Sequence, residues 1–378
     1  MSVTINGSTG VSLVQDGVIV TADMASSVPL GAKNLIINGS MAIAQRGTSV
    51  SSLTGTAYST VDRWQAVRAN LGTWTESQST DAPNGFANSL KFECTTADAS
   101  PAAGDACLVN HRFEGNMFPS LAFGTVSAKT VTLSFYVKSN KTGTFAVGFR
   151  NIDNGRSIGG NYTISSADTW EQKTFTFEGD TVSGFNIDNT VAATVELFLG
   201  AGTDYTSGTM PTSWAATSTA NRAAGQNVNI GDTIGNTFYI TGVQLELGST
   251  ATAFEHRSYG QELALCQRYY QTSYPSGVAA DGVTTITDGV TWVAINTADT
   301  SNGGSYPTPM RATPTFTIYY PGGGSGVNSA RDNDAGVAIT TIGYTGGTAT
   351  TLPRLTKGSG FTTRANTIAA QYTATSEL

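Results

Sequence analysis

The chain has 378 residues, of which only 12% are charged and 43 are glycine. Its formal net charge of −7, with 27 Asp and Glu against 20 Lys and Arg, excludes a nucleic-acid-binding protein that depends on clustered basic residues. No stretch reaches the ~20 consecutive apolar residues of a membrane-spanning helix, so we expect no membrane insertion. The composition is typical of short strands joined by turns, and the length suffices for two or three domains.

Residues 1–33 carry short apolar pieces separated by glycine and polar residues, too few to close a core. The opening "MSVTINGSTG" lacks the charged and apolar regions of a secretory signal, which predicts synthesis in the cytoplasm. We interpret the segment as an arm whose apolar residues need another surface to cover them, with a flexible tail as the equal alternative. These residues are Val11, Leu13, Val18, Ile19 and Val20.

Residues 34–258 show the alternation of an antiparallel, jelly-roll-like β-sandwich. In "TVTLSFYVK" every second residue is apolar (Val131, Leu133, Phe135, Val137), and Ser134, Tyr136 and Lys138 lie between them. Further strand-like runs follow at spacings of roughly ten to twenty residues with Gly, Asn and Asp between them, which favours antiparallel strands over crossover helices.

The segment "NTFYITGVQLEL" contains a break in its alternation. Phe238 and Ile240 occupy even positions, whereas Val243 and Leu245 occupy odd ones. An extra residue in a β-bulge would keep both halves facing inward, and Gly242 lies at the switch. The sequence therefore predicts a bulge at Gly242.

Residues 259–274 predict a short connecting helix, and residues 275–378 a second, smaller β domain with glycine-rich loops. In "YGQELALCQRYYQ" the residues Leu263, Cys266 and Tyr270 fall on one side of a helix over 260–271. Neither domain contains a fixed-period repeat, which speaks against a solenoid or a parallel β-helix.

The run Glu255-His256-Arg257 precedes this helix and is the tightest carboxylate–His–Arg cluster in the chain. Adjacent residues of an extended segment point to opposite faces, so a catalytic pair of Glu255 and His256 is disfavoured. We interpret the run as a polar junction between the two domains that pairs with nearby backbone groups.

Catalytic and metal signatures are absent from the sequence: it has two histidines and contains no HExxH pattern, no G-x-S-x-G elbow and no Walker loop. Cys94, Cys107 and His111 supply three ligands where structural zinc needs four, so buried thiols are expected instead. A glycosidase needs only two carboxylates placed by the fold, which keeps an enzyme open as an alternative. The candidates for it are Glu171, Glu196 and Asp204.

Residues 200–232 form a long polar excursion, and long loops on a rigid sandwich often bind ligands. Tyr205 and Trp214 could stack on sugar rings, and Asp204 and Asn221 could bond hydroxyl groups. The competing interpretation is that Trp214 covers the core or fills a subunit interface. Asp and Asn are plentiful enough for calcium, which stays possible, but no ordered ligand loop is recognisable, so we commit to no metal and predict no cofactor.

Several stretches resemble a β-sandwich module of tailed-bacteriophage tail fibre and receptor-binding proteins: "NLIINGSMAIAQRGTS" (34–49), "YSTVDRW" (58–64), "VTLSFYVKS" (131–139) and "GVQLELGSTATAFEHRSYGQELALCQRYYQ" (242–271). The stretches "PTPMRATPT" (307–315) and "AAQYTATSEL" (369–378) are similar to the C-terminal domain that often follows this module. The resemblance implies a structural virion protein, a homotrimer whose N-terminal arm attaches to phage tail or head proteins. It supplies no catalytic residues, and it places the helix at a trimer axis or as a brace between the domains, with Leu263 and Tyr270 buried.

Three functions follow as expectations. The first is a tail fibre or receptor-binding protein on the virion that displays its β domains to a host-surface glycan or outer-membrane receptor. A head fibre or capsid decoration protein is the alternative, because the chain has neither the heptads nor the repeats of a long fibre shaft. A tailspike that degrades polysaccharide is the second alternative.

Overall fold

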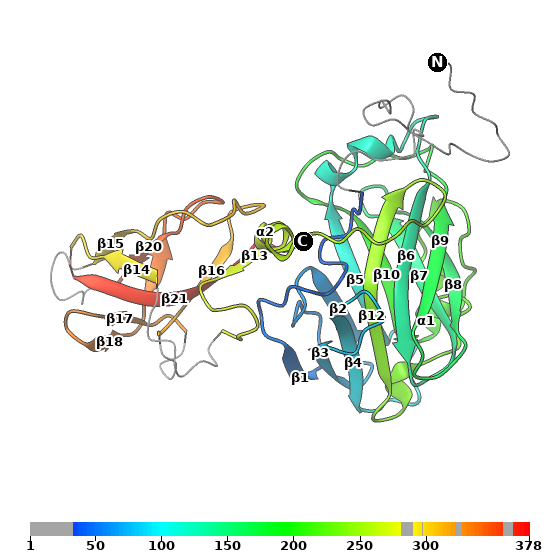
Figure 1. Cartoon of the computed structure of the whole chain (residues 1–378), viewed down its shortest axis with the longest axis horizontal. Helices are drawn as coiled ribbons and strands as arrows, with labels where there is room; N and C mark the ends of the chain where they lie inside the picture. The colour runs from blue at the N-terminus through cyan, green and yellow to red at the C-terminus, as the bar shows by residue number, and fades with distance from the viewer. Residues whose placement is uncertain (1–32, 281–289, 297, 322–326, 358–365) are drawn as a thin grey trace, which may run out of the picture.

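The computed structural model describes residues 33–280, 290–296, 298–321, 327–357 and 366–378. The arm residues from Val11 to Val20 lie outside this range, so their role stays a prediction. The described chain is mainly β, with antiparallel sheets in two bodies that lie side by side with a short helix between them (Figure 1). The expected fold class is therefore confirmed. No helix in the described part is long and apolar enough to cross a membrane.

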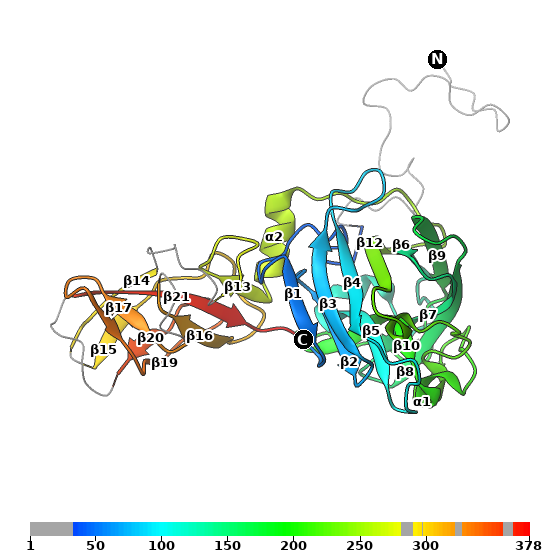
Figure 2. The same ribbon diagram turned by 90° about the horizontal axis from the view of Figure 1, so that it is seen from below.

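The larger body is a sandwich of two six-stranded sheets that lie face to face (Figure 2). Sheet A has the order β1 (Ser49–Leu53), β3 (Thr73–Ser79), β4 (Ser89–Thr96), β12 (Thr237–Leu247), β6 (Val131–Ser139), β9 (Glu171–Phe177). Sheet B has the order β11 (Ala215–Ala216), β8 (Arg156–Ile164), β7 (Gly143–Asn151), β10 (Val191–Ala201), β5 (Ala106–Glu114), β2 (Trp64–Ala69). The excursion before β12 contains the one-turn helix α1 (Thr203–Thr206).

The core lies between the two sheets and forms from the alternation seen in the sequence. Val131, Leu133, Phe135 and Val137 of β6 are all fully buried and belong to one cluster with residues of both sheets. Burial of such side chains contributes on the order of 2 kcal/mol each before the entropy of ordering the chain is deducted. The same alternation turns Ser134, Tyr136 and Lys138 to the opposite face of sheet A.

The predicted bulge is present in β12. Pairing of β12 with β6 shifts register between Thr241 and Gln244, and Gly242 has a φ of +61°. Phe238, Ile240, Val243 and Leu245 are all fully buried. The extra residue thus keeps both halves of the strand facing the core, as the switch in alternation predicted.

The connecting helix is shorter than predicted. Helix α2 spans Tyr259–Gln267 and starts with a capping box between Ser258 and Gln261. Tyr270 was expected on this helix but lies at the start of β13 (Tyr270–Thr272), opposite Thr375 of β21 (Thr367–Thr375). The predicted helix is wrong at Tyr270 because pairing with β21 offers the backbone an alternative set of hydrogen bonds. Cys266 and Tyr270 are nevertheless buried, and Leu263 is half-buried.

The smaller body has its own core and is organised around β21, which pairs with β13, β14, β16 and β17. Trp292, Ile318, Leu355 and Ile368 are fully buried in this core. The remaining strands are β14 (Val290–Val293), β15 (Asp299–Asn302), β16 (Thr315–Tyr319), β17 (Ala330–Asp332), β18 (Val337–Ile339), β19 (Gly343–Thr345) and β20 (Arg354–Thr356).

Helix α2 and the end of the chain join the two bodies (Figure 1). Cys266 and Tyr269 pack with Ile37 and Ile43 of the sandwich, and Leu378 packs against the same cluster. Within one chain the helix therefore packs against the sandwich and against the last residue, and its place at a trimer axis stays a prediction.

Candidate functional site

The outward face of sheet A carries aromatic and polar side chains in rows across neighbouring strands. Tyr136 of β6 lies between Thr241 of β12 and Gln172 of β9, each directly opposite in register. The next row contains Tyr239, which lies between Lys91 of β4 and Lys138 of β6. A flat sheet face with aromatic rings at adjacent positions is suited to bind a flat ligand rather than to pack against a core.

A pocket of about 450 Å³ opens on this face. We call it the aromatic pocket. Phe86 lies at its centre, with ring centroids 5.5 Å from Tyr136, 5.0 Å from Phe254 and 5.3 Å from His256. Its polar lining comes from Asn84, Ser134, Gln172 and Thr252.

Gly242, the bulge residue, is also required by the aromatic pocket. A Cβ atom at this position would lie 2.7 Å from Cζ of Phe86 and 2.9 Å from Cδ2 of Tyr136. The missing side chain therefore lets both rings approach the backbone of β12, and the positive φ is readily adopted only by glycine. One residue thus sets the strand register and makes space for the rings above it.

A second aromatic pair lies farther along the same face. The rings of Trp170 and Tyr239 are 6.1 Å apart, and Nζ of Lys138 lies 4.6 Å from the centre of the Tyr239 ring and 5.5 Å from that of Trp170. Asp81 accepts hydrogen bonds from Lys138 and from Nε1 of Trp170, the latter at 3.1 Å. The bond from Lys138 is the main reason that the pKa of Asp81 lies below its usual value.

Within the run Glu255-His256-Arg257, the His256 side chain turns away from that of Glu255, as expected of an extended segment, whereas Glu255 and Arg257 form an ion pair of 3.2 Å. Glu255 accepts hydrogen bonds from the backbone N–H groups of Lys33 at 3.0 Å and Asn34 at 2.8 Å. Arg257 donates hydrogen bonds to the carbonyl oxygens of Asn34 and Ile36. Partial burial raises the pKa of Glu255, but these N–H groups and Arg257 outweigh it, so the pKa is lowered. His256 instead packs with Phe86 and is exposed.

A larger hollow lies on the other side of this run. It has a volume of about 760 Å³, and we call it the junction groove. Its walls come from residues 255–257, from α2 and from Thr308 and Pro309 of the smaller body. His256 lines both the junction groove and the aromatic pocket.

Of the four residues predicted to bind glycan from the 200–232 excursion, Tyr205, Trp214 and Asn221 are used in contacts within the fold, whereas the Asp204 side chain is exposed. Trp214 packs against Phe123 and Phe149 with ring centroids 5.6 and 5.5 Å away, and its Nε1 donates to the carbonyl of Glu178. Tyr205 packs on Phe198 and under Arg222. Asn221 accepts a hydrogen bond from the backbone N–H of Thr209. Asp204 is exposed and lies beside residue 104. Trp214 therefore covers the core, as the competing interpretation had it, and the structure does not gather the four around one cavity.

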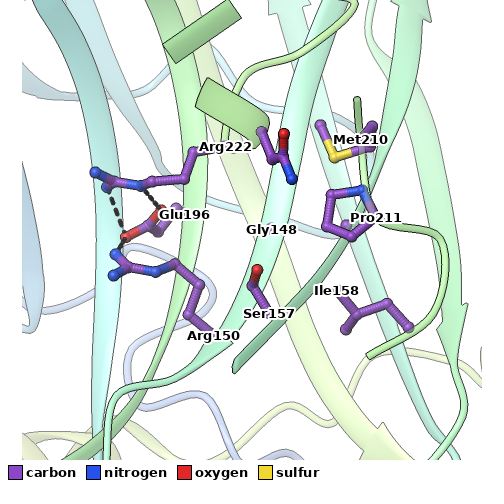
Figure 3. Close-up of a pocket in the computed structure, with 10 residues that line it drawn as sticks. Gly148, Arg150, Ser157, Ile158, Glu196, Met210, Pro211 and Arg222 are labelled. Carbon is purple, nitrogen blue, oxygen red and sulfur yellow. Dashed lines mark hydrogen bonds and ion pairs between the residues drawn. The ribbon is translucent and has the colours of Figure 1, made fainter. Parts of the chain in front are cut away.

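Asn221 lines a different and much smaller cavity over sheet B (Figure 3). Its volume of about 10 Å³ leaves room for one water molecule at most. There Glu196 receives hydrogen bonds from Arg150 at 2.5 Å and from Nε and Nη2 of Arg222 at 3.0 and 2.9 Å. These ion pairs tie the excursion to β10, so we assign the cavity a structural role.

The three carboxylates considered for a glycosidase lie on three different elements. Glu171 lies on β9 of sheet A, where it accepts two backbone N–H groups and pairs with Lys173. Glu196 lies on β10 of sheet B between its two arginines, and Asp204 lies in α1. A glycosidase needs two carboxyl groups within roughly 5–9.5 Å across one cleft, whereas Glu171 and Glu196 lie on different sheets and are each held in an ion pair.

Buried thiols are observed at Cys94, Cys107 and Cys266, all of them free. Burial raises the pKa of each, that of Cys107 to about 12. His111 is buried and accepts the N–H of Ile37, and burial holds its pKa well below the usual value. No group of three potential metal ligands occurs within the described ranges.

The aromatic pocket was missed from the sequence because its rings come from separate segments. Tyr136 did carry a signal, since it is a large aromatic residue at an outward position of an alternating strand. Phe86, by contrast, lies in the loop between β3 and β4, where no periodicity applies.

No protein-family model matches the chain, and no curated protein sequence does. Among solved structures, the enzymatically active domain of tailspike protein 4 of bacteriophage CBA120 is 13% identical with a TM-score of 0.31, over 57% of this chain and 21% of that one. The chain thus spans about a fifth of the length of that solved chain. A family 4 carbohydrate-binding module is 12% identical with a TM-score of 0.28, over 55% of this chain and 99% of the module. The family 11 module of a Clostridium thermocellum cellulase is 12% identical with a TM-score of 0.27, over 53% and 99%. TM-scores this low support no functional argument.

Proposed function

We propose that the chain is a structural virion protein of a tailed bacteriophage, a tail fibre or receptor-binding protein that attaches to a host-surface glycan. The observation that carries this proposal is the aromatic pocket, where four rings lie beside amide and hydroxyl groups in a hollow of about 450 Å³. Sugar rings present C–H groups that stack on aromatic faces and hydroxyl groups that bond to amides.

The virion role is supported by the phage-fibre-like stretches of the sequence. The longest of them, residues 242–271, contributes Gly242, residues 251–254 and His256 to the aromatic pocket, and α2 to the joint between the bodies. The stretch that resembles a fibre module therefore supplies part of the hollow that would hold the glycan.

The binding test uses the full chain on an array of bacterial lipopolysaccharide O-chains, capsular polysaccharides and teichoic acids. Phe86→Ala and Tyr136→Ala should each lower binding by at least about tenfold, because stacked aromatic rings contribute most to such sites. Tyr205→Ala, a matched change in the 200–232 excursion, should leave binding unchanged. Binding lost in Y205A but kept in F86A would move the site to that excursion.

The same array separates the alternatives. New reducing ends that accumulate on a bound polysaccharide would indicate a depolymerase rather than a receptor-binding protein. A wild-type chain that binds nothing on the array, and binds no host cells, would favour a head fibre or capsid decoration protein.

Virion location and trimer formation need their own measurements. Immunogold electron microscopy of the source particle should label tail projections, and label on the head would favour a head fibre. Light scattering of the full chain should give three times the 39.2 kDa of one chain, and a stable mass of one chain would overturn the trimer.

A further inference from the structure

The aromatic pocket and the junction groove share one wall. Residues 251–254 line the pocket, residues 255–257 line the groove, and His256 belongs to both. Along an extended segment alternate side chains point to opposite sides. His256 packs with Phe86 on the pocket side, whereas Arg257 pairs with Glu262 of α2 on the other. The exposed side chain of His256 therefore lies between two hollows that open side by side.

The junction groove has walls from both bodies. Ala264 and Leu265 of α2 and Pro309 of the smaller body supply apolar surface, and Thr308 and Gln261 supply polar groups. Arg268 is fixed at the groove by two hydrogen bonds of 2.8 and 2.7 Å from Nε and Nη2 to Glu114 of the sandwich. A mostly apolar hollow with a few oriented polar groups is typical of a small-molecule site.

We infer that a bound glycan continues from the aromatic pocket over His256 into the junction groove, so that both bodies contact it. This inference rests on the proposed function and narrows it from any host sugar to an oligosaccharide chain. Each hollow alone lies within the roughly 300–1,000 Å³ of a site for one small ligand. Together they fit a ligand that is longer than a terminal sugar.

The size of the ligand makes the inference measurable. Affinity should rise with the number of sugar units until the junction groove is filled, and then level off. Because a chain that crosses the seam binds only when the two bodies are docked, long fragments should also raise the unfolding temperature of the smaller body more than short ones.

The experiment uses fragments of one to eight sugar units, prepared by partial acid hydrolysis of the polysaccharide that binds best on the array. Their dissociation constants are measured by calorimetry with the full chain. Ala264→Trp fills the groove from an exposed helical position, and Ala216→Trp is the matched control at an exposed alanine on the edge strand of sheet B. A264W should weaken binding of the long fragments by at least about tenfold and leave the short ones unchanged, and A216W should change neither.

Two outcomes would overturn the inference while the proposed function stands. One is wild-type affinity that does not increase beyond two sugar units. The other is an A264W variant that binds long fragments as the wild type does. This outcome includes the case in which a second copy of the chain occupies the groove, so that A264W changes the mass measured by light scattering instead of the affinity for glycan. If Phe86→Ala leaves every fragment bound, the proposed site itself is wrong.

Discussion

Arg46 and Glu377 form an ion pair of 2.9 Å although 331 positions separate them in the chain. Glu377 also pairs with Arg63, whose side chain is fully buried and whose guanidinium lies 3.5 Å from the centre of the Tyr269 ring. One carboxylate of the smaller body thus pairs with two cations of the sandwich, of which Arg46 also pairs with Asp62. This contact ties the C-terminal segment of the smaller body to the sandwich.

Glu377→Gln should therefore destabilise the protein. The change leaves Arg63 buried without a counter-charge, and breaking a buried ion pair costs about 3–5 kcal/mol. Urea unfolding should show this loss, and proteolysis should cleave the region around α2 faster. The matched control is Glu93→Gln, which removes the partner of Lys91 from a partly exposed pair and should cost less than about 1 kcal/mol. Equal effects of the two changes would refute the importance of the contact.

Asp62 should make stability depend on pH in an unusual direction. Burial raises its pKa from 3.8 to about 6, although Arg46 and a hydrogen bond from Gln45 oppose this. At a pH between these two pKa values, the Asp62 carboxyl group holds a proton in the folded protein but loses it in the unfolded chain. The contribution of Asp62 to stability therefore falls as pH rises through this window. At pH 7 the cost is on the order of 3 kcal/mol.

Comparison with Asp62→Asn isolates this effect, because the amide does not titrate. Urea unfolding of both proteins is measured at pH 4, 5, 6 and 7. The wild type should lose stability relative to D62N as pH rises, mostly between about pH 4 and 6. A difference that stays constant over this range would show that the carboxyl group keeps an ordinary pKa.

Gly242→Ala should damage both the bulge and the aromatic pocket. Its Cβ atom would meet Phe86 and Tyr136, and the positive φ adds a cost of about 1–2 kcal/mol. Gly155 is the matched control, since its φ of +60° is nearly the same and nothing lies within 4 Å of an added Cβ atom. Both substitutions should lower stability, but only G242A should also lose glycan binding. If G155A reduced binding as much, the loss would come from backbone strain alone.

Trp170 should report on a ligand that covers the outward face of sheet A. Trp64, Trp74 and Trp292 are fully buried, and Trp214 packs against Phe123 and Phe149, so a glycan on this face changes the surroundings of Trp170 most. Addition of the polysaccharide selected on the array should change tryptophan emission. Trp170→Phe should remove most of this change, and Trp214→Phe should preserve it. A response that survives in W170F would place the ligand elsewhere.

Alternation in the sequence determined which residues of each strand face the core, including the bulge at Gly242, because strand geometry repeats every two residues. The end of α2 was different. Its helical pattern extends through Tyr270, and only the partner strand β21, about 100 residues later, decided that the backbone pairs there instead. Local periodicity contains no information about such a partner.

The sequence by itself thus determined the β class and the inward faces of the strands. Only the tertiary structure decided that Phe86, Tyr136, Phe254 and His256 meet, because these rings come from two loops and a strand that the sheet order brings together. It also decided that Trp214 covers the core, since a loop aromatic looks the same in sequence whether it faces solvent or packs on Phe149. Periodicity specifies a face, and which side chains become neighbours on that face depends on long-range strand pairing.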